Sequence, residues 1–240
     1  DKYIKDLKNT VNQLKLDIRK SFLDPDFTDG TWIWKQAYPC TVVSIFEEGC
    51  IEKGLSYLEG GPGYNVVSPH IGGLPNTINS LYATKKLVFD DKKASFKELM
   101  EILKNNWEGN EKLRLIAKNI PEKYGNNNAI ADEITKDFTD YCASLINNKP
   151  NSRGGVFRAS LFSIDRFVYF GSKTMATPDG RKSGEPFSEN QSPTYGADKN
   201  GITALLKSIS KLPFERTAGG GLNLTFSQKV SSDVLKALIL

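Results

Sequence analysis

The sequence predicts a helix-rich α/β protein, and three observations support this prediction. Apolar residues recur at helical spacing through most of the chain up to Pro150. The stretch from Val156 to Ala176 has no helical period and is rich in residues that favour strands. With 240 residues, of which 39% are hydrophobic and 25% are charged, the chain is long enough to bury a substantial core.

The amphipathic segments predict a series of helices in the first part of the chain. The first helix is expected from an amphipathic pattern between Ile4 and Phe22 and should end before Asp24-Pro25, because the residue before a proline is pushed out of the helical region. A loop with Trp32 and Trp34 follows. Further helices are expected over residues 41–58, 77–88, 95–103 and 130–145, and the third of these opens with the capping box Ser95-Phe96-Lys97-Glu98.

The last third of the chain alternates between strands, turns and helices. Residues 156–176 are the best strand candidate. Thr177–Gly180 is a turn, because Pro178 presets φ at its second position and Gly180 relieves its fourth. A long loop at 183–200 is then expected to lead to a helix at 202–212, a short strand at 222–226 and a last helix that Ser231 caps.

Both ends of the sequence favour a chain that is truncated. The chain begins at Asp1, without Met, and is already inside an amphipathic pattern. It stops in the apolar run Val234–Leu240, with no capping glycine and no polar tail. We therefore expect that both ends are cut.

Charge and hydropathy exclude several classes of partner. Lys and Arg number 32 against 28 for Asp and Glu, and the basic residues are scattered rather than gathered into a stripe. Nucleic acid and anionic membranes are therefore not expected as partners. No apolar run approaches the roughly 20 residues of a membrane helix, and no leader opens the chain, so the cytoplasm is the expected compartment.

Cysteine, histidine and glycine patterns predict no metal and no bound cofactor. Cys40, Cys50 and Cys142 are widely spaced, and His70 has no partner at metal-ligand spacing. His70 is read as a loop histidine, because nothing nearby would orient it as an acid or base. The glycine clusters at 60–63 and 219–221 do not stand between a strand and a helix, so they are turns and not nucleotide-binding loops.

Several segments follow the order and spacing of one known family. Its motifs are matched by Cys50–Gly54 with Gly60-Gly61 and Tyr64-Asn65, Asn79–Leu81 with Lys85–Asp90, Asn106–Gly109, Lys123–Asn126 and Ala131–Ile134. The most specific block begins at Ala176–Arg181 (ATPDGR) and continues through Pro186, Ser192-Pro193, Gly196, Asp198 and Gly201–Ala204. In these segments the chain resembles the glycyl radical enzymes of the pyruvate formate-lyase type.

This resemblance implies both a fold and a chemistry. The fold would be the later part of the large α/β barrel of these enzymes. In their chemistry a radical-SAM activating enzyme installs a glycyl radical, which draws hydrogen from a cysteine, and the thiyl radical then attacks a small-molecule substrate. Such a barrel must exclude water and oxygen. The resemblance also implies a homodimeric parent enzyme.

The two residues on which this chemistry depends are not expected in the chain. Gly49-Cys50-Ile51-Glu52 reads like the family's thiyl-cysteine motif, but the residues after it match a downstream segment. Cys50 also shares an apolar helical face with Val43, Phe46 and Tyr57, where cysteine behaves as a small hydrophobe. By the resemblance, the thiyl cysteine precedes Asp1 and the radical glycine follows Leu240, so no catalytic residue is assigned.

These observations predict a fragment of a glycyl radical lyase or dehydratase that is catalytically incomplete by itself. Residues 1–200 would belong to the barrel domain and residues 201–240 to the start of the glycyl radical domain. One alternative is a formate acetyltransferase (pyruvate formate-lyase) proper, which the segment Lys211-Leu212-Pro213-Phe214 favours. Another is a non-catalytic remnant or interaction module.

Two residues are candidates for the substrate pocket. In a strand, Arg166 would share one face with Phe162, Ile164, Val168 and Phe170, where a lone guanidinium is costly unless it is paired. Its partner is either a structural carboxylate or, by the resemblance, an anionic substrate, since an arginine fork suits a carboxylate, sulfonate or phosphate. Ile164 is the apolar candidate on the same face.

Overall fold

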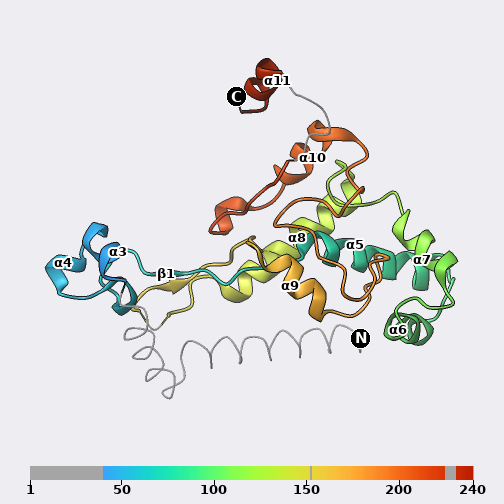
Figure 1. The fold of residues 1–240 in the computed structure, drawn as a ribbon, viewed down its shortest axis with the longest axis horizontal. Coiled ribbons are helices and arrows are strands. Elements are labelled where there is room, and N and C mark those ends of the chain that lie inside the picture. Colours follow the sequence, from blue (N-terminus) through green and yellow to red (C-terminus); the bar gives the residue numbers. More distant parts are fainter. Residues whose placement is uncertain (1–39, 152, 225–230, 240) are drawn as a thin grey trace. The chain divides into compact units, whose positions relative to one another are not determined.

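The computed structural model describes residues 40–151, 153–224 and 231–239 (Figure 1). The predicted helix at 4–22 and the loop with Trp32 and Trp34 lie outside these residues. The chain divides into two compact units, Asp1–Pro69 with Ser144–Ala159 and His70–Ala143 with Ser160–Leu240. The domain boundary expected near residue 200 stays a prediction.

The first unit is built from short elements. They are α3 (Thr41–Phe46), α4 (Cys50–Lys53), the 3-10 turn η1 (Tyr57–Glu59), β1 (Val66–Val67) and β2 (Val156–Phe157). The prediction of a single helix over 41–58 is wrong, because Gly49 has a φ of 93° and turns the chain between α3 and α4. A Cβ on Gly49 would also lie 2.9 Å from Gly61 O, so only glycine fits there without a shift.

The two strands of the first unit pair in parallel, with Val66 opposite Val156. Asn151 joins the approaches to both strands, since its Nδ2 donates to Asn65 O at 2.8 Å and to Val156 O at 3.0 Å. A Cβ on Gly155 would lie 1.8 Å from Asn65 O. The missing side chain therefore lets the turn before β2 press against the residue that precedes β1.

The second unit is mainly helical. Its elements are α5 (Leu74–Thr84), the π-helix η2 (Lys85–Asp90), α6 (Phe96–Lys104), α7 (Glu111–Lys118), α8 (Ala129–Ile146, whose last residues belong to the first unit), α9 (Arg166–Lys173), α10 (Gly201–Ile209), the 3-10 turn η3 (Phe214–Arg216) and α11 (Ser232–Ile239). The helices predicted near 77–88, from Ser95, over 130–145 and over 202–212 are confirmed, with boundaries shifted by a few residues. The last helix begins one residue after Ser231.

The capping box at the start of α6 is confirmed. Ser95 Oγ accepts a hydrogen bond from Glu98 N at 3.2 Å, and the Glu98 carboxylate accepts one from Ser95 N at 2.7 Å. The bonds from Ser95 lower the pKa of Glu98. Ser95 and Glu98 therefore satisfy two backbone donors that a helix start otherwise leaves open.

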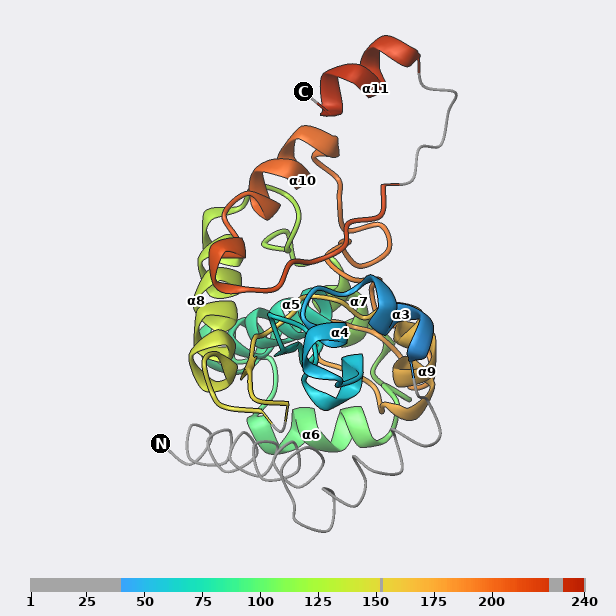
Figure 2. The same ribbon diagram turned by 90° about the vertical axis from the view of Figure 1, so that its left-hand side faces the viewer.

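The core of the second unit forms around α5 and η2. One cluster joins η2 to α6 and α7 through Leu87, Leu99, Leu103, Trp107, Ala117 and Ala176. Another joins α5 to later segments through Leu74, Ile78, Tyr124, Leu161 and Leu212. Figures 1 and 2 both show α5 beside α8, from which Ile134 packs against Tyr82 and Ala83. This packing places segments from distant parts of the sequence around one helix.

The prediction of a strand through 156–176 is wrong for its second half. Beyond β2, isolated parallel bridges form at Ser160 and Leu161, and the chain then turns at Ile164 and enters α9. Val168, Tyr169 and Phe170, which suggested a strand, lie instead on this helix, since tertiary context overrides intrinsic strand preference. A Cβ on Gly171 would lie 2.4 Å from Glu185 O, so glycine in α9 lets the 185–187 segment cross the helix closely.

The turn at 177–180 is confirmed, with Gly180 N donating to Thr177 O at 3.1 Å. No regular strand covers residues 222–224, and residues 225–226 of that prediction lie outside the described part of the chain. Among the described residues, no helix combines the length and the apolar character that spanning a membrane requires.

Candidate functional site

An extended segment, Ser160–Ser163, lies between two other segments of the second unit. Ile71 N donates to Ser160 O at 2.8 Å on one side, and Leu161 N donates to Gly219 O at 2.9 Å on the other. Both contacts belong to parallel bridges, His70 with Ser160 and Leu161 with Gly220. The segment is therefore held like the middle strand of a small parallel layer, and it leads directly to Ile164 and Arg166.

Asn190 fastens the end of this segment. Its Oδ1 accepts hydrogen bonds from the backbone N of Ser163 at 2.8 Å and of Ile164 at 3.1 Å, and Ser163 Oγ lies 3.4 Å from the same oxygen. In return, Asn190 N donates to Ser163 Oγ at 2.8 Å. Asn190 and Ser163 are both buried. We call this reciprocal set of bonds the Asn190 clasp.

Ile164 lies at the turn that the clasp holds. Its φ is 51°, in the left-handed region that a β-branched residue rarely enters. Its side chain is 58% exposed. An exposed isoleucine on a constrained turn suits an apolar contact with another molecule or with chain beyond the described residues.

Arg166 does not lie where a strand would place it. It is the first residue of α9, so it does not share a two-residue period with Phe162 and Phe170. Its side chain is 65% exposed, and its Nε lies 3.6 Å from the carboxylate of Asp165, which is 81% exposed. The predicted cost of burying a lone guanidinium does not arise among the described residues. The guanidinium of Arg166 is instead exposed to solvent, two positions after Ile164.

The turn at 177–181 is tied to the start of α5 through buried polar side chains. Asp179 Oδ2 accepts a hydrogen bond from Asn76 Nδ2 at 2.8 Å, and Asp179 Oδ1 accepts one from Thr177 Oγ1 at 2.6 Å. Asn76 Oδ1 accepts a bond from Ser188 N at 2.8 Å. One asparagine thus links this turn to the loop that carries Asn190.

Arg181 is buried and bonds to the backbone of the segments around the turn at 177–181. Its guanidinium donates to the carbonyls of Glu185 (2.5 Å), Thr174 (3.2 Å), Gly171 (3.4 Å) and Met175, and to Thr177 Oγ1 (3.2 Å). It also lies 4.5 Å from the ring centre of Phe187. Burial lowers the pKa of Arg181, which is 6% exposed. The arginine of the ATPDGR motif is therefore a structural tie and does not reach outward.

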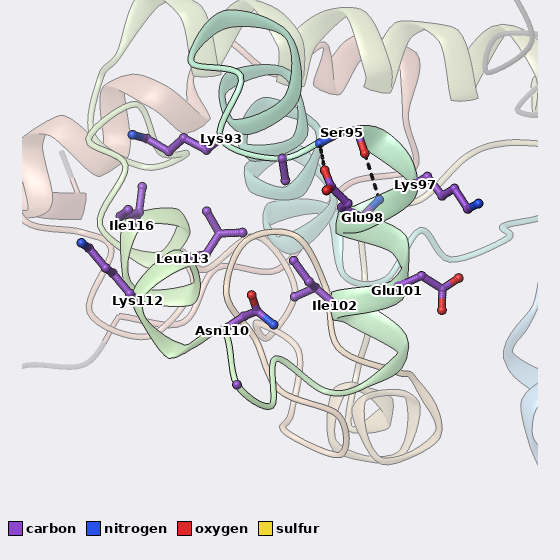
Figure 3. A pocket seen from close by; sticks show the side chains of 12 residues that line it. Lys93, Ser95, Lys97, Glu98, Glu101, Ile102, Asn110, Lys112, Leu113 and Ile116 are labelled. Atoms are coloured by element: carbon purple, nitrogen blue, oxygen red, sulfur yellow. Dashed lines mark hydrogen bonds between the residues drawn. The ribbon is translucent and has the colours of Figure 1, made fainter.

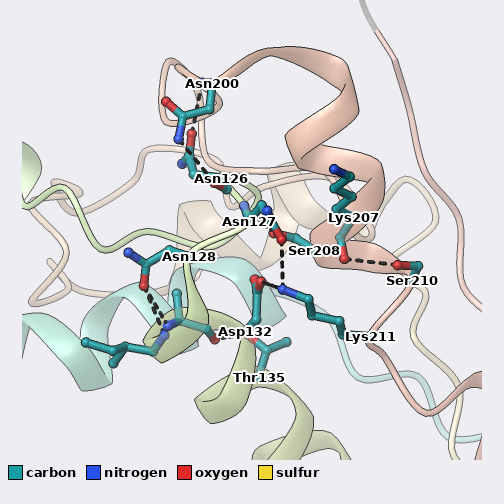
Figure 4. A network of polar contacts seen from close by, with 12 residues as sticks. Asn126, Asn127, Asn128, Asp132, Thr135, Asn200, Lys207, Ser208, Ser210 and Lys211 are labelled. Atoms are coloured by element: carbon teal, nitrogen blue, oxygen red, sulfur yellow. Dashed lines mark hydrogen bonds and ion pairs between the residues drawn. The ribbon is translucent and has the colours of Figure 1, made fainter.

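A polar network joins the residues that flank α10 to the start of α8 and to the residues just before it (Figure 4). Lys211 Nζ lies 2.6 Å from Asp132 Oδ2 and 2.8 Å from Asn127 Oδ1. Asn126 Oδ1 accepts from Asn200 N at 3.1 Å. Figure 2 shows α10 at the N-terminal end of α8, where these contacts form. The network fixes α10 in the second unit and offers no group poised for catalysis.

A groove of about 950 Å³ lies between α6 and α7 (Figure 3). Ile102, Leu113 and Ile116 give it apolar walls, and Lys93 and Lys112 are among its charged residues. Its lining includes no His, Cys or Asp, and the carboxylate of Glu98 is used by the capping box. The other carboxylate of the lining, Glu101, lies 2.7 Å from Lys104 Nζ, so both acids of this groove already have partners.

The thiols and His70 lie in different surroundings. Cys50 is buried, as the core interpretation predicts, and a Cβ on Gly61 would lie 2.7 Å from its Sγ. Burial raises the pKa of Cys50 and raises that of Cys142 to about 11, which keeps both as thiols. His70 is exposed, with its ring centre 5.9 Å from that of Phe162. Among the described residues no three metal-ligating side chains cluster.

Asn76 and Asn190 are the organising residues that the sequence analysis missed. Both are buried asparagines whose side chains bond to backbone groups far along the chain. The sequence offered one local indication, which is the kind of residue at position 190. Asn190 stands in a loop and has a φ of 49°, and asparagine tolerates that region better than most residues. Its partners cannot be read from the sequence.

The chain is similar to known dehydratases. The chain is 36% identical over 192 residues to trans-4-hydroxy-L-proline dehydratase of Clostridioides difficile, covering 80% of this chain and 24% of the relative. It is 36% identical over 206 residues to (2S)-3-sulfopropanediol dehydratase of Klebsiella oxytoca, covering 83% of this chain and 25% of the relative. The chain thus spans about a quarter of the length of these relatives.

The fold matches as well. A glycyl radical enzyme from Archaeoglobus fulgidus superimposes with a TM-score of 0.68 and 35% identity, over 75% of this chain and 23% of that structure. The expected fold class, part of the α/β barrel of glycyl radical enzymes, is confirmed. Residues 31–171 match the model of the family described as pyruvate formate lyase-like. The chain belongs to the pyruvate formate lyase-like family of glycyl radical enzymes.

Proposed function

We propose that this chain is one part of a longer glycyl radical enzyme, a lyase or dehydratase that acts on a small metabolite. The observation that carries the proposal is the similarity to two dehydratases, each over four-fifths or more of this chain. Within this proposal the complete enzyme is a cytoplasmic homodimer, activated by a radical-SAM enzyme. The glycyl radical and the thiyl cysteine belong to other parts of the polypeptide.

Exposed apolar surface supports the view that the chain functions within a larger protein. None of the residues of α3 is buried, and Val42 and Phe46 are 71% and 85% exposed. On α9, Val168, Tyr169 and Phe170 are also exposed. Contiguous exposed apolar side chains of this kind mark surfaces that other protein normally covers.

Electron paramagnetic resonance tests the proposed chemistry. The full-length protein and this 240-residue chain would each be incubated anaerobically with the activating enzyme and S-adenosylmethionine. We expect the glycyl doublet from the full-length protein and none from the chain alone. A doublet from the isolated chain would show that the radical glycine lies within it, and no doublet from the full-length protein would remove the proposed function.

Within this function we propose Ile164 and Arg166 as substrate-pocket residues, with an anionic metabolite as substrate. The support is that the guanidinium of Arg166 is solvated and its Nε lies 3.6 Å from an exposed carboxylate, which leaves its fork accessible to an anion. Arg166→Ala is expected to lower kcat/KM by roughly 2–5 kcal/mol of transition-state stabilisation with little change in melting temperature. Arg166→Lys should recover part of it, because an ammonium cannot make the bidentate contact.

Lys173→Ala provides the matched control, because Lys173 is an exposed cation at the other end of the same helix. Equal effects of Arg166→Ala and Lys173→Ala would count against a specific role for Arg166. Unchanged kinetics in Arg166→Ala together with a large loss of stability would make Arg166 a structural residue.

Formate acetyltransferase activity remains the second candidate, on the sequence of Lys211–Phe214 alone. Two residues of this segment also have a structural use, since Lys211 pairs with Asp132 and Leu212 lies in the core. An assay with pyruvate and coenzyme A separates this candidate from a dehydratase. A non-catalytic remnant remains the third reading, and it is excluded if the full-length protein forms the radical.

A further inference from the structure

The turn at Ile164 is strained and at the same time firmly held. A β-branched residue with a φ of 51° is an outlier, and such outliers persist only where the surroundings determine them. Here the surroundings are the Asn190 clasp, in which one side-chain oxygen accepts from two consecutive backbone N–H groups. Arg166 N donates to Ser163 O at 2.9 Å and closes the turn from the other side.

The clasp itself has little freedom. Asn190 is buried and has a φ of 49°, so its backbone is also in the left-handed region. Gly221 lies directly against its amide, since a Cβ there would be 3.2 Å from Asn190 Cγ and from Nδ2. The neighbouring Gln191 N donates to Gly221 O at 2.9 Å. The segment at Gly221 therefore packs against the side chain of Asn190, which in turn holds the turn at Ile164.

The two side chains that follow the clasp are exposed to solvent and are not packed in the core. Ile164 is 58% exposed and Arg166 is 65% exposed, and they flank a single turn. The clasp satisfies two backbone donors, and it also fixes the backbone from which two solvent-facing side chains project, one apolar and one cationic. Such an arrangement suits a binding site, because side chains on a fixed backbone bind with a smaller loss of conformational freedom.

We infer that Asn190 is a positioning residue for substrate: its clasp aims Ile164 at the carbon skeleton and Arg166 at the anionic group of a small carboxylate or sulfonate. This inference rests on the proposed function, in which Ile164 and Arg166 line the pocket. Without the clasp the turn can leave the left-handed region, and both side chains then move away from their bound positions. The expected consequence is weaker substrate binding without loss of fold.

Three substitutions at one position separate positioning from folding. Asn190→Gly keeps easy access to the left-handed φ but removes the oxygen that accepts from Ser163 and Ile164. Asn190→Asp keeps that oxygen, and Asn190→Ala removes both the oxygen and the tolerance of a positive φ. Ile164→Gly removes the apolar side chain and relieves the strain at the turn.

The test uses the unactivated full-length protein, so that binding is measured without the radical. Calorimetric titration would give the Kd of two probes, trans-4-hydroxy-L-proline and (2S)-3-sulfopropanediol. For a probe that binds, we expect Asn190→Gly to raise the Kd at least tenfold, Asn190→Asp to stay within about threefold of the wild type, and melting temperatures of both to stay close to the wild type. In an Ile164→Gly background, Asn190→Gly should have less effect, because the strained turn is no longer present.

Two results would overturn the inference. One is an unchanged Kd in Asn190→Gly, and the other is the absence of binding by either probe to the wild type. Neither result touches the proposed radical chemistry, which is measured separately from the glycyl doublet of the same preparation after activation. Conversely, intact clasp-dependent binding without any doublet would remove the proposed radical function and leave the positioning role of Asn190 standing.

Discussion

The ammonium group of Lys211 lies 2.6 Å from the carboxylate of Asp132, whose side chain is 3% exposed, although 79 positions separate the two residues. Asp132 belongs to the first turn of α8, and Lys211 follows α10. The ion pair therefore joins two elements that lie far apart in the sequence. It is half-buried, because the side chain of Lys211 is 44% exposed.

Removing Lys211 is expected to destabilise the protein more than removing a free lysine. Lys211→Met leaves the buried carboxylate of Asp132 without its cation, at a cost of about 1–2 kcal/mol after allowance for solvent screening. Lys207→Met is the control, since Lys207 is exposed on the same helix region. Melting temperatures measure both. In Lys211→Met with Asp132→Asn part of the loss should return, and strict additivity would argue against coupling.

Replacing Arg181 with lysine is expected to be far from conservative. The guanidinium donates to four backbone carbonyls and one hydroxyl, and an ammonium cannot reach all of them from one position. We expect Arg181→Lys to lower the free energy of unfolding by about 2–4 kcal/mol, with Arg166→Lys, at an exposed site, nearly neutral. Equal melting temperatures for the two variants would contradict the structural role of Arg181.

Cys50→Ala is expected to cost about 1 kcal/mol of stability, the usual size for removing a small buried side chain, and to leave turnover of the full-length enzyme largely intact. The reason is that Cys50 is buried against Gly61 and its pKa is raised by burial. Chemical denaturation and the steady-state rate are the measurements. Complete loss of activity with normal stability would identify Cys50 as the thiyl residue.

The thiol of Cys142 is expected to make stability fall in alkaline solution. Burial raises its pKa from about 9 to about 11, so the folded state keeps a proton that the unfolded state releases. Its contribution is fully present below pH 9 and is lost as the pH rises toward 11. Stability of the wild type should therefore fall more steeply across this range than that of Cys142→Ala. Parallel curves would show that Cys142 does not titrate there.

Local patterns in the sequence predict those parts of the fold that local interactions determine. The helical period foretells α5, α6, α8 and α10, and the Ser95 capping box and the turn at 177–180 appear as expected. The break between α3 and α4 could not be predicted, because Gly49 is required there by its approach to Gly61. α9 was not predicted because its composition favours a strand, whereas the chain turns at Ile164 and then forms a helix.

The candidate site was predicted only in part. Ile164 and Arg166 were chosen from a strand geometry that α9 replaces, and their place in a pocket stays a prediction. The residues that organise the site could not be found, because Asn190 bonds to groups 26 and 27 positions away and Asn76 to groups more than 100 positions away. No local pattern contains such pairs.

The hydrogen bonds of Asn76 also imply a delay during synthesis, because they cannot form until their partners have been made. Its amide reaches Asp179 and Ser188, which follow it by 103 and 112 residues. A ribosome adding about 5–20 residues per second makes that stretch in roughly 5–20 s. Throughout this interval the side chain of Asn76 lacks both of these partners, so the second unit cannot reach its final packing while residues 177–188 are still unmade.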